Sequence, residues 1–349
     1  MFSRKPLLAL LLCSVLAASC ATTPATESRN MTLKVAFVSN SISFFPFYVA
    51  QQKAYFTSQG LTLDPAIPPV LGTGPKVADA IETGSIEVAG ESTTDAFTIS
   101  RVDAGIRMVG TFANDYLLDI VVSKRFEEQT HLSAASPLAE KVKALVGRKI
   151  GIASPNSAGD ALVTYLLKQQ GFSDQRDVTK VFLGSTSALT GLGALAQGRV
   201  DAISFAVPAG QVVQAKGIGD IFISPVRGDV PPMQGQLYGV VFAKQQVITS
   251  KPKAIQAFIR ALAQAETWIH KNPNQARALL ATYLKLDPNT TNTIWSATLP
   301  SMPMTPQISQ QAFETADQFH VDAGLIALKL SYNDLVDADT MNNALKGLK

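Results

Sequence analysis

One stretch, residues 147–171 (GRKIGIASPNSAGDALVTYLLKQQG), constrains the fold most because it reads as a complete strand–loop–helix unit. Apolar and β-branched residues predict a short buried strand over 149–153. Ser, Pro, Asn and Gly predict a tight loop over 154–159. Apolar residues at helical spacing then predict a helix over 160–170, which ends at a glycine. A chain built from such units folds as an α/β protein.

The start of that helix is the first candidate for a ligand site. Backbone N–H groups at a helix start have no intrahelical partner, so they suit an anionic or strongly polar ligand group. We predict ligand contacts from Ser154, Asn156, Ser157, Ala158 and Gly159. The alternative is that the two serines only cap the helix.

The same alternation of strands and helices runs through most of the chain. Further strands are expected over 34–38, 61–67, 86–89, 106–111, 119–123, 221–226 and 237–243, with helices between many of them. Strands that alternate with helices predict parallel βαβ units in a doubly wound sheet. From residue 251 onward the pattern becomes helical.

An internal echo predicts two similar lobes. Residues 34–39 (KVAFVS) resemble 149–154 (KIGIAS), at an offset of 115 residues. Residues 80–89 (AIETGSIEVA) resemble 194–203 (ALAQGRVDAI), at an offset of 114 residues. Two echoes at nearly one offset indicate a repeated topology. The alternative is that every αβ unit requires a glycine stop followed by an apolar strand.

The N-terminus resembles a targeting segment. Arg4 and Lys5 precede an apolar run over 7–16, which is too short to span a bilayer. Small residues then lead to Cys20, as in the cleavage site of bacterial lipoproteins. We expect a lipid-anchored Cys20; the alternative is an ordinary signal peptide. The net charge is only +3, with no basic stripe, so nucleic acid is not an expected partner.

Polar residues follow the predicted strands, where ligands bind in open α/β sheets. We therefore predict one ligand site from these strand ends. Besides 154–159, the predicted ligand contacts are Ser39, Asn40, Ser41, Phe44, Glu91, Ser92, Thr93, Thr94, Asn114, Tyr116, Ser185 and Phe205. Several of the hydroxyls also fit a capping role. Among them, Phe44, Tyr116 and Phe205 are candidates to stack on a flat ligand.

Glu91 bears most on the charge of the ligand. A carboxylate in the cleft repels an anion and favours a cation or an amino-heterocycle. The alternative is a surface glutamate paired within its lobe. The strand ends carry almost no Lys or Arg, which argues against nitrate or bicarbonate, whereas neutral donors would still hold a sulfonate.

An enzyme is not expected. His131, His270 and His320 are scattered along the sequence, and no nucleophilic cysteine follows Cys20. No catalytic triad, metal site or cofactor is therefore predicted.

Five segments in order carry a family resemblance: FPFYVAQQKAYFTSQGLTLD, DAIETGSIEVAGES, LVGRKIGIASPNSAGDALVTYLLKQQG, ALAQGRVDAISFAVP and YNDLVDADTMNNAL. Together they resemble the extracytoplasmic substrate-binding proteins of bacterial ABC importers. Within these, the chain is most similar to the nitrate/sulfonate/taurine and thiamine-pyrimidine-precursor binding group. The resemblance implies a periplasmic-binding-protein type II fold, with a ligand cleft between two α/β lobes joined by two hinge strands.

The resemblance also implies a division of the chain. The expected parts are a signal peptide (1–19), a lipidated Cys with a flexible tether (20–31), the first part of lobe 1 (32–118), lobe 2 (119–240), and a hinge return with C-terminal helices on lobe 1 (241–349). We expect a monomer outside the cytoplasm that passes a small solute to an ABC permease. The first ligand class is a pyrimidine-precursor-like or amine solute, and the second is an aliphatic sulfonate. Two other classes of protein are alternatives, a sensor domain and an enzyme that makes a thiamine pyrimidine. Such an enzyme needs a cleft histidine and a Cys-rich motif that the sequence lacks.

Overall fold

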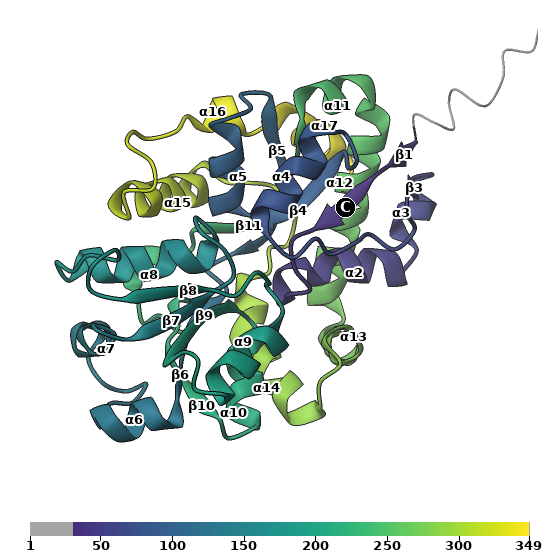
Figure 1. Ribbon diagram of the computed structural model, residues 1–349. Helices are drawn as coiled ribbons and strands as arrows, with labels where there is room; N and C mark the ends of the chain where they lie inside the picture. The colour runs from purple at the N-terminus through teal and green to yellow at the C-terminus, as the bar shows by residue number, and fades with distance from the viewer. Residues whose placement is uncertain (1–30, 349) are drawn as a thin grey trace, which may run out of the picture.

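The computed structural model describes residues 31–348, which form two lobes, each built on its own β-sheet (Figure 1). The predicted two-lobe α/β architecture is confirmed. The predicted signal peptide, Cys20 and residues 20–30 of the tether lie outside the described residues. Within residues 31–348, no helix combines the length and apolar character needed to cross a bilayer.

The first lobe contains a four-stranded sheet in the order β2-β4-β11-β5, and the second a five-stranded sheet in the order β10-β6-β9-β7-β8. A small parallel pair, β1 with β3, lies beside the first lobe. The strands are β1 (Thr32–Leu33), β2 (Val35–Phe37), β3 (Thr62–Leu63), β4 (Val88–Ser92), β5 (Ile106–Asn114), β6 (Leu118–Ser123), β7 (Lys149–Ile152), β8 (Thr179–Phe182), β9 (Ala202–Ala206), β10 (Gly219–Ile223) and β11 (Leu237–Lys244). The strand expected over 61–67 is thus reduced to two residues, whereas the third expected strand extends through Ser92.

Helices surround both sheets. The α-helices are α2 (Phe45–Gln52), α3 (Tyr55–Ser58), α4 (Gly74–Glu82), α5 (Thr93–Ser100), α6 (Lys124–Thr130), α7 (Leu138–Ala144), α8 (Ala158–Gln169), α9 (Ala188–Ala196), α10 (Ala209–Ala215), α11 (Gln245–Ser250), α12 (Pro252–Lys271), α13 (Pro273–Leu284), α14 (Pro288–Thr298), α15 (Gln310–Asp322), α16 (Tyr332–Leu335) and α17 (Ala338–Leu345). Short 3-10 helices are η1 (Ile42–Phe44), η2 (Pro225–Arg227), η3 (Pro231–Met233) and η4 (Leu299–Ser301). The long amphipathic α12 contacts α2 of the first lobe and α17. Other C-terminal helices contact the second lobe, α14 at α10 and α15 at α8.

The two sheets repeat one topology. In the first lobe β2 pairs parallel with β4, and in the second β7 pairs parallel with β9. Each parallel pair then receives an antiparallel neighbour, β11 beside β4 and β6 beside β9. Gly84 and Gly198, one from each echoed segment, end α4 and α9 with φ of 69° and 66°, a left-handed conformation that glycine adopts without strain. The sheets are therefore mixed, rather than parallel throughout as the sequence pattern predicts.

The antiparallel strands arise where the chain passes between lobes. It leaves the first sheet at the end of β5 and enters the second at β6, and it returns to the first sheet at β11. This exchange brings the carboxyl ends of β2 and β4 opposite those of β7 and β9. Because β11 spans the predicted boundary at residue 240, the exact division into lobes stays a prediction.

Candidate functional site

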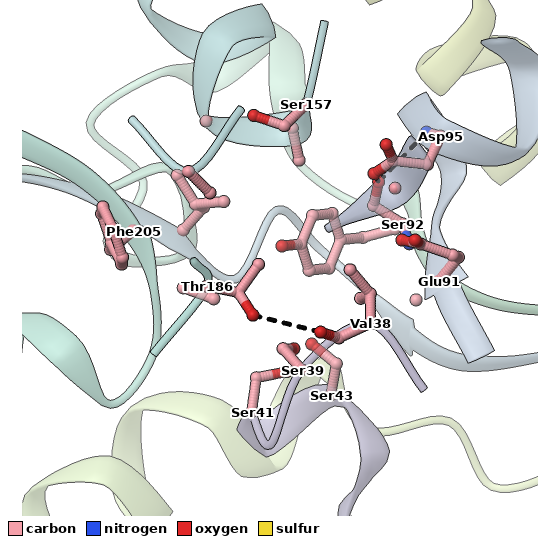
Figure 2. Close-up of a pocket in the computed structure, with 18 of the residues that line it drawn as sticks. Val38, Ser39, Ser41, Ser43, Glu91, Ser92, Asp95, Ser157, Thr186 and Phe205 are labelled. Atoms are coloured by element: carbon pink, nitrogen blue, oxygen red, sulfur yellow. Dashed lines mark hydrogen bonds between the residues drawn. The ribbon is translucent and has the colours of Figure 1, made fainter. Parts of the chain in front are cut away.

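A cavity of about 60 Å³ lies between the lobes, at the carboxyl ends of the parallel strands (Figure 2). Ten of the predicted ligand contacts line it: Ser39, Ser41, Phe44, Glu91, Ser92, Ser154, Ser157, Ala158, Gly159 and Phe205. They come from segments far apart in the sequence, and five belong to each lobe. The structure thus brings together most of the polar strand ends that the sequence singles out.

The other seven predicted contacts lie outside the cavity: Asn40, Thr93, Thr94, Asn114, Tyr116, Asn156 and Ser185. Asn40 and Asn156 are exposed, and the Ser185 hydroxyl accepts the backbone N–H of Ser187. Asn114 instead lines a separate groove next to residues 303–310.

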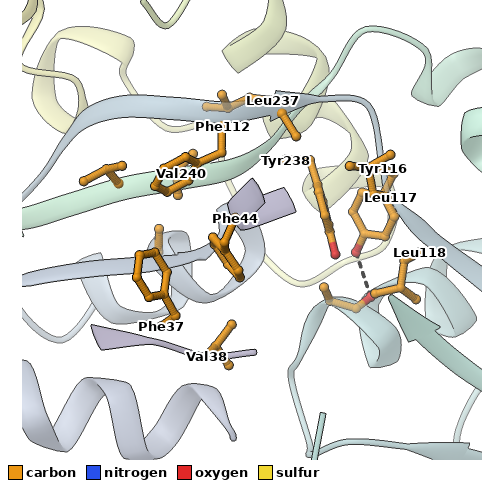
Figure 3. Packing of buried hydrophobic residues seen from close by; sticks show 14 of the residues in the cluster. Phe37, Val38, Phe44, Phe112, Tyr116, Leu117, Leu118, Leu237, Tyr238 and Val240 are labelled. Carbon is orange, nitrogen blue, oxygen red and sulfur yellow. Dashed lines mark hydrogen bonds between the residues drawn. The ribbon is translucent and has the colours of Figure 1, made fainter. Parts of the chain in front are cut away.

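Three of these seven residues form hydrogen bonds next to the cavity. The Thr93 hydroxyl donates to the Tyr238 carbonyl oxygen at 3.1 Å, and the Thr94 hydroxyl lies 2.9 Å from His320 Nε2. The Tyr116 hydroxyl donates to the Ala158 carbonyl oxygen at 2.7 Å (Figure 3). All three side chains are buried, and the Thr93 and Tyr116 hydroxyls bond to the backbone of two cavity-lining residues, Tyr238 and Ala158.

The start of α8 forms one wall of the cavity. Ser157 precedes the helix, and its hydroxyl donates to the Ser154 carbonyl oxygen at 2.7 Å instead of capping the helix. Gly159 packs so closely on β9 that a Cβ atom there would lie 2.6 Å from the Ser204 carbonyl oxygen. The helix start therefore needs glycine to reach the cavity, and the N–H groups of its first turn have no partner within the helix.

Four buried side-chain oxygens around the cavity have no hydrogen-bond partner within the described part of the chain. They are Ser43 Oγ and Glu91 Oε1 in the first lobe, and Ser154 Oγ and Ser204 Oγ in the second. Glu91 has no exposed surface at all. Buried polar groups in proteins are nearly always paired, so unpaired ones in a cavity point to a bound partner.

An acidic pair forms part of the first-lobe wall. The Glu91 Oε2 atom accepts the Ser92 backbone N–H at 2.9 Å, and the Asp95 Oδ2 atom accepts the Ser92 hydroxyl at 2.5 Å (Figure 2). Burial raises the pKa of Glu91 well above its ordinary value, and the nearby Asp95 carboxylate raises it further. Burial also raises the pKa of Asp95, against the opposing hydrogen bond from Ser92. No Lys or Arg is among the residues of 31–348 that line the cavity.

Hydrogen bonds between the lobes hold the cavity closed. The Thr186 hydroxyl donates to the Val38 carbonyl oxygen at 3.1 Å, and its backbone N–H donates to Gly72 at 3.1 Å (Figure 2). The Ile42 N–H donates to the Val207 carbonyl oxygen at 3.2 Å. The structure therefore shows the closed arrangement of the two lobes.

The aromatic side chains divide between cavity and core. Of the aromatic residues at 44–48, only Phe44 reaches the cavity, and it packs edge-on against Phe112 with ring centroids 5.5 Å apart (Figure 3). Phe205 lines the cavity but also packs close to Gly191 of α9. Tyr238 of β11 adds a third aromatic wall, and its ring lies 4.7 Å from that of Tyr116.

Eleven lining residues are absent from the sequence-based prediction: Val38, Ser43, Gly74, Asp95, Leu118, Ala153, Thr186, Ser204, Ala206, Tyr238 and Gly239. Ser43 and Asp95 belong to helices that open directly after polar strand ends, so their position in the sequence indicates proximity to the site. Tyr238 and Gly239 come from the returning strand β11, for which the sequence pattern offers no such indication.

The described residues contain no group of three or more His, Cys, Asp or Glu side chains arranged to hold a metal ion. His320 is buried beside α5, where burial lowers its pKa to about 4. It is therefore a neutral structural histidine under ordinary conditions, away from the cavity.

Comparison with known proteins assigns the family. The model of the NMT1-like family matches residues 26–284, which is most of the chain. The chain belongs to the NMT1-like family. A "Putative thiamine biosynthesis protein" of Haemophilus influenzae is 28% identical to this NMT1-like chain over 306 residues, covering 82% of the chain and 85% of the relative.

Solved structures share the fold of this NMT1-like protein at lower identity. A ligand-binding component of an ABC-type import system from Staphylococcus aureus, with zinc bound, has a TM-score of 0.71 and 16% identity, covering 90% of this chain and 99% of that one. An alkanesulfonate-binding protein of Xanthomonas axonopodis, bound to MOPS, has a TM-score of 0.66 and 19% identity, covering 87% and 98%. The structural relatives are mainly binding proteins, and they confirm the periplasmic-binding-protein fold.

Proposed function

We propose that this NMT1-like protein is the solute-binding component of an ABC importer and captures a small organic solute in the cavity between its lobes. The observation that carries the proposal is the set of four unpaired, buried oxygens, Ser43 Oγ and Glu91 Oε1 on one side and Ser154 Oγ and Ser204 Oγ on the other. Each unpaired buried polar group costs about 1–3 kcal/mol. A solute that pairs with both sets recovers this energy and bridges the lobes.

The cavity suits a small solute. Its volume of about 60 Å³ is several times the minimum of about 10–15 Å³ that holds one water molecule. Hydroxyl groups from both lobes supply hydrogen bonds, while Phe44, Phe205 and Tyr238 supply apolar walls. This combination of apolar walls and a few polar groups is typical of ligand sites.

The preferred ligand class is a nitrogen-containing organic solute, an amine or a pyrimidine-precursor-like molecule. The Glu91 and Asp95 carboxyl groups line the cavity, and the lining residues include no Lys or Arg to offset them. An amino group would donate to the unpaired Glu91 Oε1 atom. The name of the Haemophilus influenzae relative agrees with this class.

The second ligand class is an aliphatic sulfonate. The fold similarity to the alkanesulfonate-binding protein favours it, and the serine hydroxyls and the N–H groups of α8 would be its neutral donors. A sulfonate would need Glu91 to be protonated, since two anions in one buried cavity repel each other.

The solute would be passed to a membrane permease by a protein anchored at the membrane. The closed form, held by the Thr186 bonds, would be the form that docks on the permease. Cys20 would carry the lipid anchor that keeps a monomeric protein at the outer face of the membrane, in the periplasm or on the cell surface. Labelling cells with radioactive palmitate tests the anchor, since a Cys20→Ser variant should lose the label.

Thermal unfolding against a solute panel tests the function. The chain from Ala21 onward contains every described element, and the panel holds amines, pyrimidines, sulfonates and inorganic anions. A true ligand at about 100 times its Kd adds roughly 2.7 kcal/mol, which raises Tm by a few degrees. A shift with amines or pyrimidines supports the first class, and a shift with sulfonates supports the second. No shift with any solute would contradict the proposed function.

A further inference from the structure

Two carboxyl groups share one buried wall of the cavity without a basic partner. Glu91 is the last residue but one of β4, and Asp95 lies in the first turn of α5. Ser92 donates one hydrogen bond to each of them. Gly74 makes room for this arrangement, because a Cβ atom there would lie 2.1 Å from Asp95 Oδ1. Glu91 Oε1 remains unpaired and buried, next to the cavity.

Within the described residues, no Lys, Arg or His forms an ion pair with either carboxyl. Helix α8 contributes Asp160, which is 2.5 Å from Lys180, and β6 contributes the buried Asp119. Strand β11 contributes Tyr238 and also carries Lys244, which pairs with Glu82 and Asp103, while β2 has no titratable residue. Strand β5 carries Arg107, which donates to the Ala104 and Ile106 carbonyl oxygens. Helix α15 carries Glu314, Asp317, His320 and Asp322, of which the neutral His320 is bonded to Thr94. The titratable residues of α4 that follow Gly74 are the exposed Lys76, Asp79 and Glu82.

We propose that the Glu91–Asp95 pair holds one proton when no solute is bound, and that a cationic solute enters the cavity in exchange for this proton. The proposal rests on the proposed function and names the charge of its ligand. Two adjacent buried carboxylates without a counter-ion repel each other, and one proton removes that repulsion. A bound ammonium group supplies the missing positive charge, so the proton leaves to the solvent.

Asp95 is the member of the pair that stays ionised. It accepts the Ser92 hydroxyl, and it lies in the first turn of a helix, where negative charge is stabilised. Glu91 accepts one backbone hydrogen bond and has no exposed surface, so it is the member that holds the proton. The raised pKa of Glu91 agrees with this assignment.

The exchange predicts a strong pH dependence. Where Glu91 is protonated, release of one proton per solute makes the apparent affinity rise tenfold for each pH unit. An ammonium solute stays charged up to about pH 9, as a lysine does, so its own titration does not interfere.

Infrared spectroscopy tests the first half of the proposal on the protein alone. At pH 7, the protonated carboxyl band should be larger in the wild type than in Glu91→Gln. The control Glu128→Gln makes the same change at an exposed position of α6 and should keep the wild-type band. Glu91→Met, which keeps the length of the side chain, replaces Glu91→Gln if that variant does not fold. An unchanged band in a folded Glu91→Gln variant, or no titrating carboxyl above pH 6, would overturn the proposal.

Calorimetry with ethanolamine tests the second half. Titrations between pH 6 and pH 8, in buffers of different ionisation enthalpy, count the protons released. We expect about one proton per ethanolamine in the wild type and in Glu128→Gln, and none in Glu91→Gln. Binding of ethanolamine without proton release, or binding of ethanesulfonate but not ethanolamine, would overturn the exchange while leaving solute binding intact. No binding of any solute class would instead contradict the proposed function and remove the exchange with it.

Discussion

Asp119 offers a direct test of how buried charge limits the stability of this protein. It lies in β6, next to the cavity-lining Leu118, with no exposed surface. Neither carboxyl oxygen has a well-formed hydrogen bond within the described residues. Burial raises the pKa of Asp119 from 3.8 to about 6, although the Ser224 side chain and the Arg227 guanidinium oppose the rise.

The direction of the effect on stability follows from this rise. A carboxyl with a higher pKa in the folded state binds its proton more tightly there than in the unfolded chain. The loss of folding stability caused by burying the ionised Asp119 is therefore absent at low pH and grows as the pH rises from about 4 to about 6. At pH 7 and above, the cost reaches roughly 3 kcal/mol. An asparagine at this position cannot ionise and avoids the cost.

Urea unfolding of Asp119→Asn and the wild type at pH 4.5 and pH 8 measures this cost. The stability of the variant relative to the wild type should increase by roughly 2 kcal/mol between the two pH values. Asp79→Asn, at an exposed position of α4, controls for the general effect of removing a carboxylate. An equal difference at both pH values would refute the reasoning, because it would show that Asp119 does not titrate in this range.

Three further substitutions test the closed cavity. Thr186→Val removes the hydroxyl bond to the Val38 carbonyl oxygen, which is worth about 1 kcal/mol, so solute affinity should fall roughly fivefold. Small-angle scattering should show a larger solute-free protein. An affinity equal to that of the wild type would contradict a role of Thr186 in closure. Gly159→Ala places a Cβ atom 2.6 Å from the Ser204 carbonyl oxygen and should lower the free energy of unfolding by about 1–3 kcal/mol. In the control Gly193→Ala, the new Cβ atom meets no atom within 4 Å, so the free energy of unfolding should not fall. Ser204→Ala removes an unpaired buried hydroxyl, so it should raise Tm without solute and weaken solute binding; a lower Tm would mean that the hydroxyl is paired.

The sequence predicts the fold well because its strongest patterns are local. The unit at 147–171 requires only that a β-branched strand, a polar loop and an amphipathic helix follow one another, and β7 and α8 form there. Residues 80–89 and 194–203 resemble each other partly because each helix is followed by a residue in the left-handed conformation, Gly84 or Gly198. Glycine adopts this conformation most easily. The antiparallel entry of β6 and β11 is not predictable in this way, because it depends on where the chain crosses between lobes.

The site is predicted less completely, since its walls come from several elements at once. Ser204 lies inside strand β9, where a single serine among apolar residues looks like an ordinary strand residue. Asp95 fits a helix-capping pattern with Ser92, so its approach to the cavity depends on the absence of a side chain at Gly74. Conversely, Asn156 follows a strand as expected, but its left-handed conformation, with φ of 58°, accompanies a turn away from the cavity.

The repeated topology explains why the two walls of the cavity differ in chemistry. At an offset of 115 residues, Ser39 corresponds to Ser154, and both loops keep a serine at the cavity. At an offset of 114 residues, Glu91 at the end of β4 corresponds to Phe205 near the end of β9, on the opposite wall (Figure 2). One backbone plan thus presents a buried carboxyl from one lobe and an aromatic ring from the other. Such a cavity is complementary to a solute with a charged or N–H-donating end and an apolar or flat end, and an inorganic anion has neither.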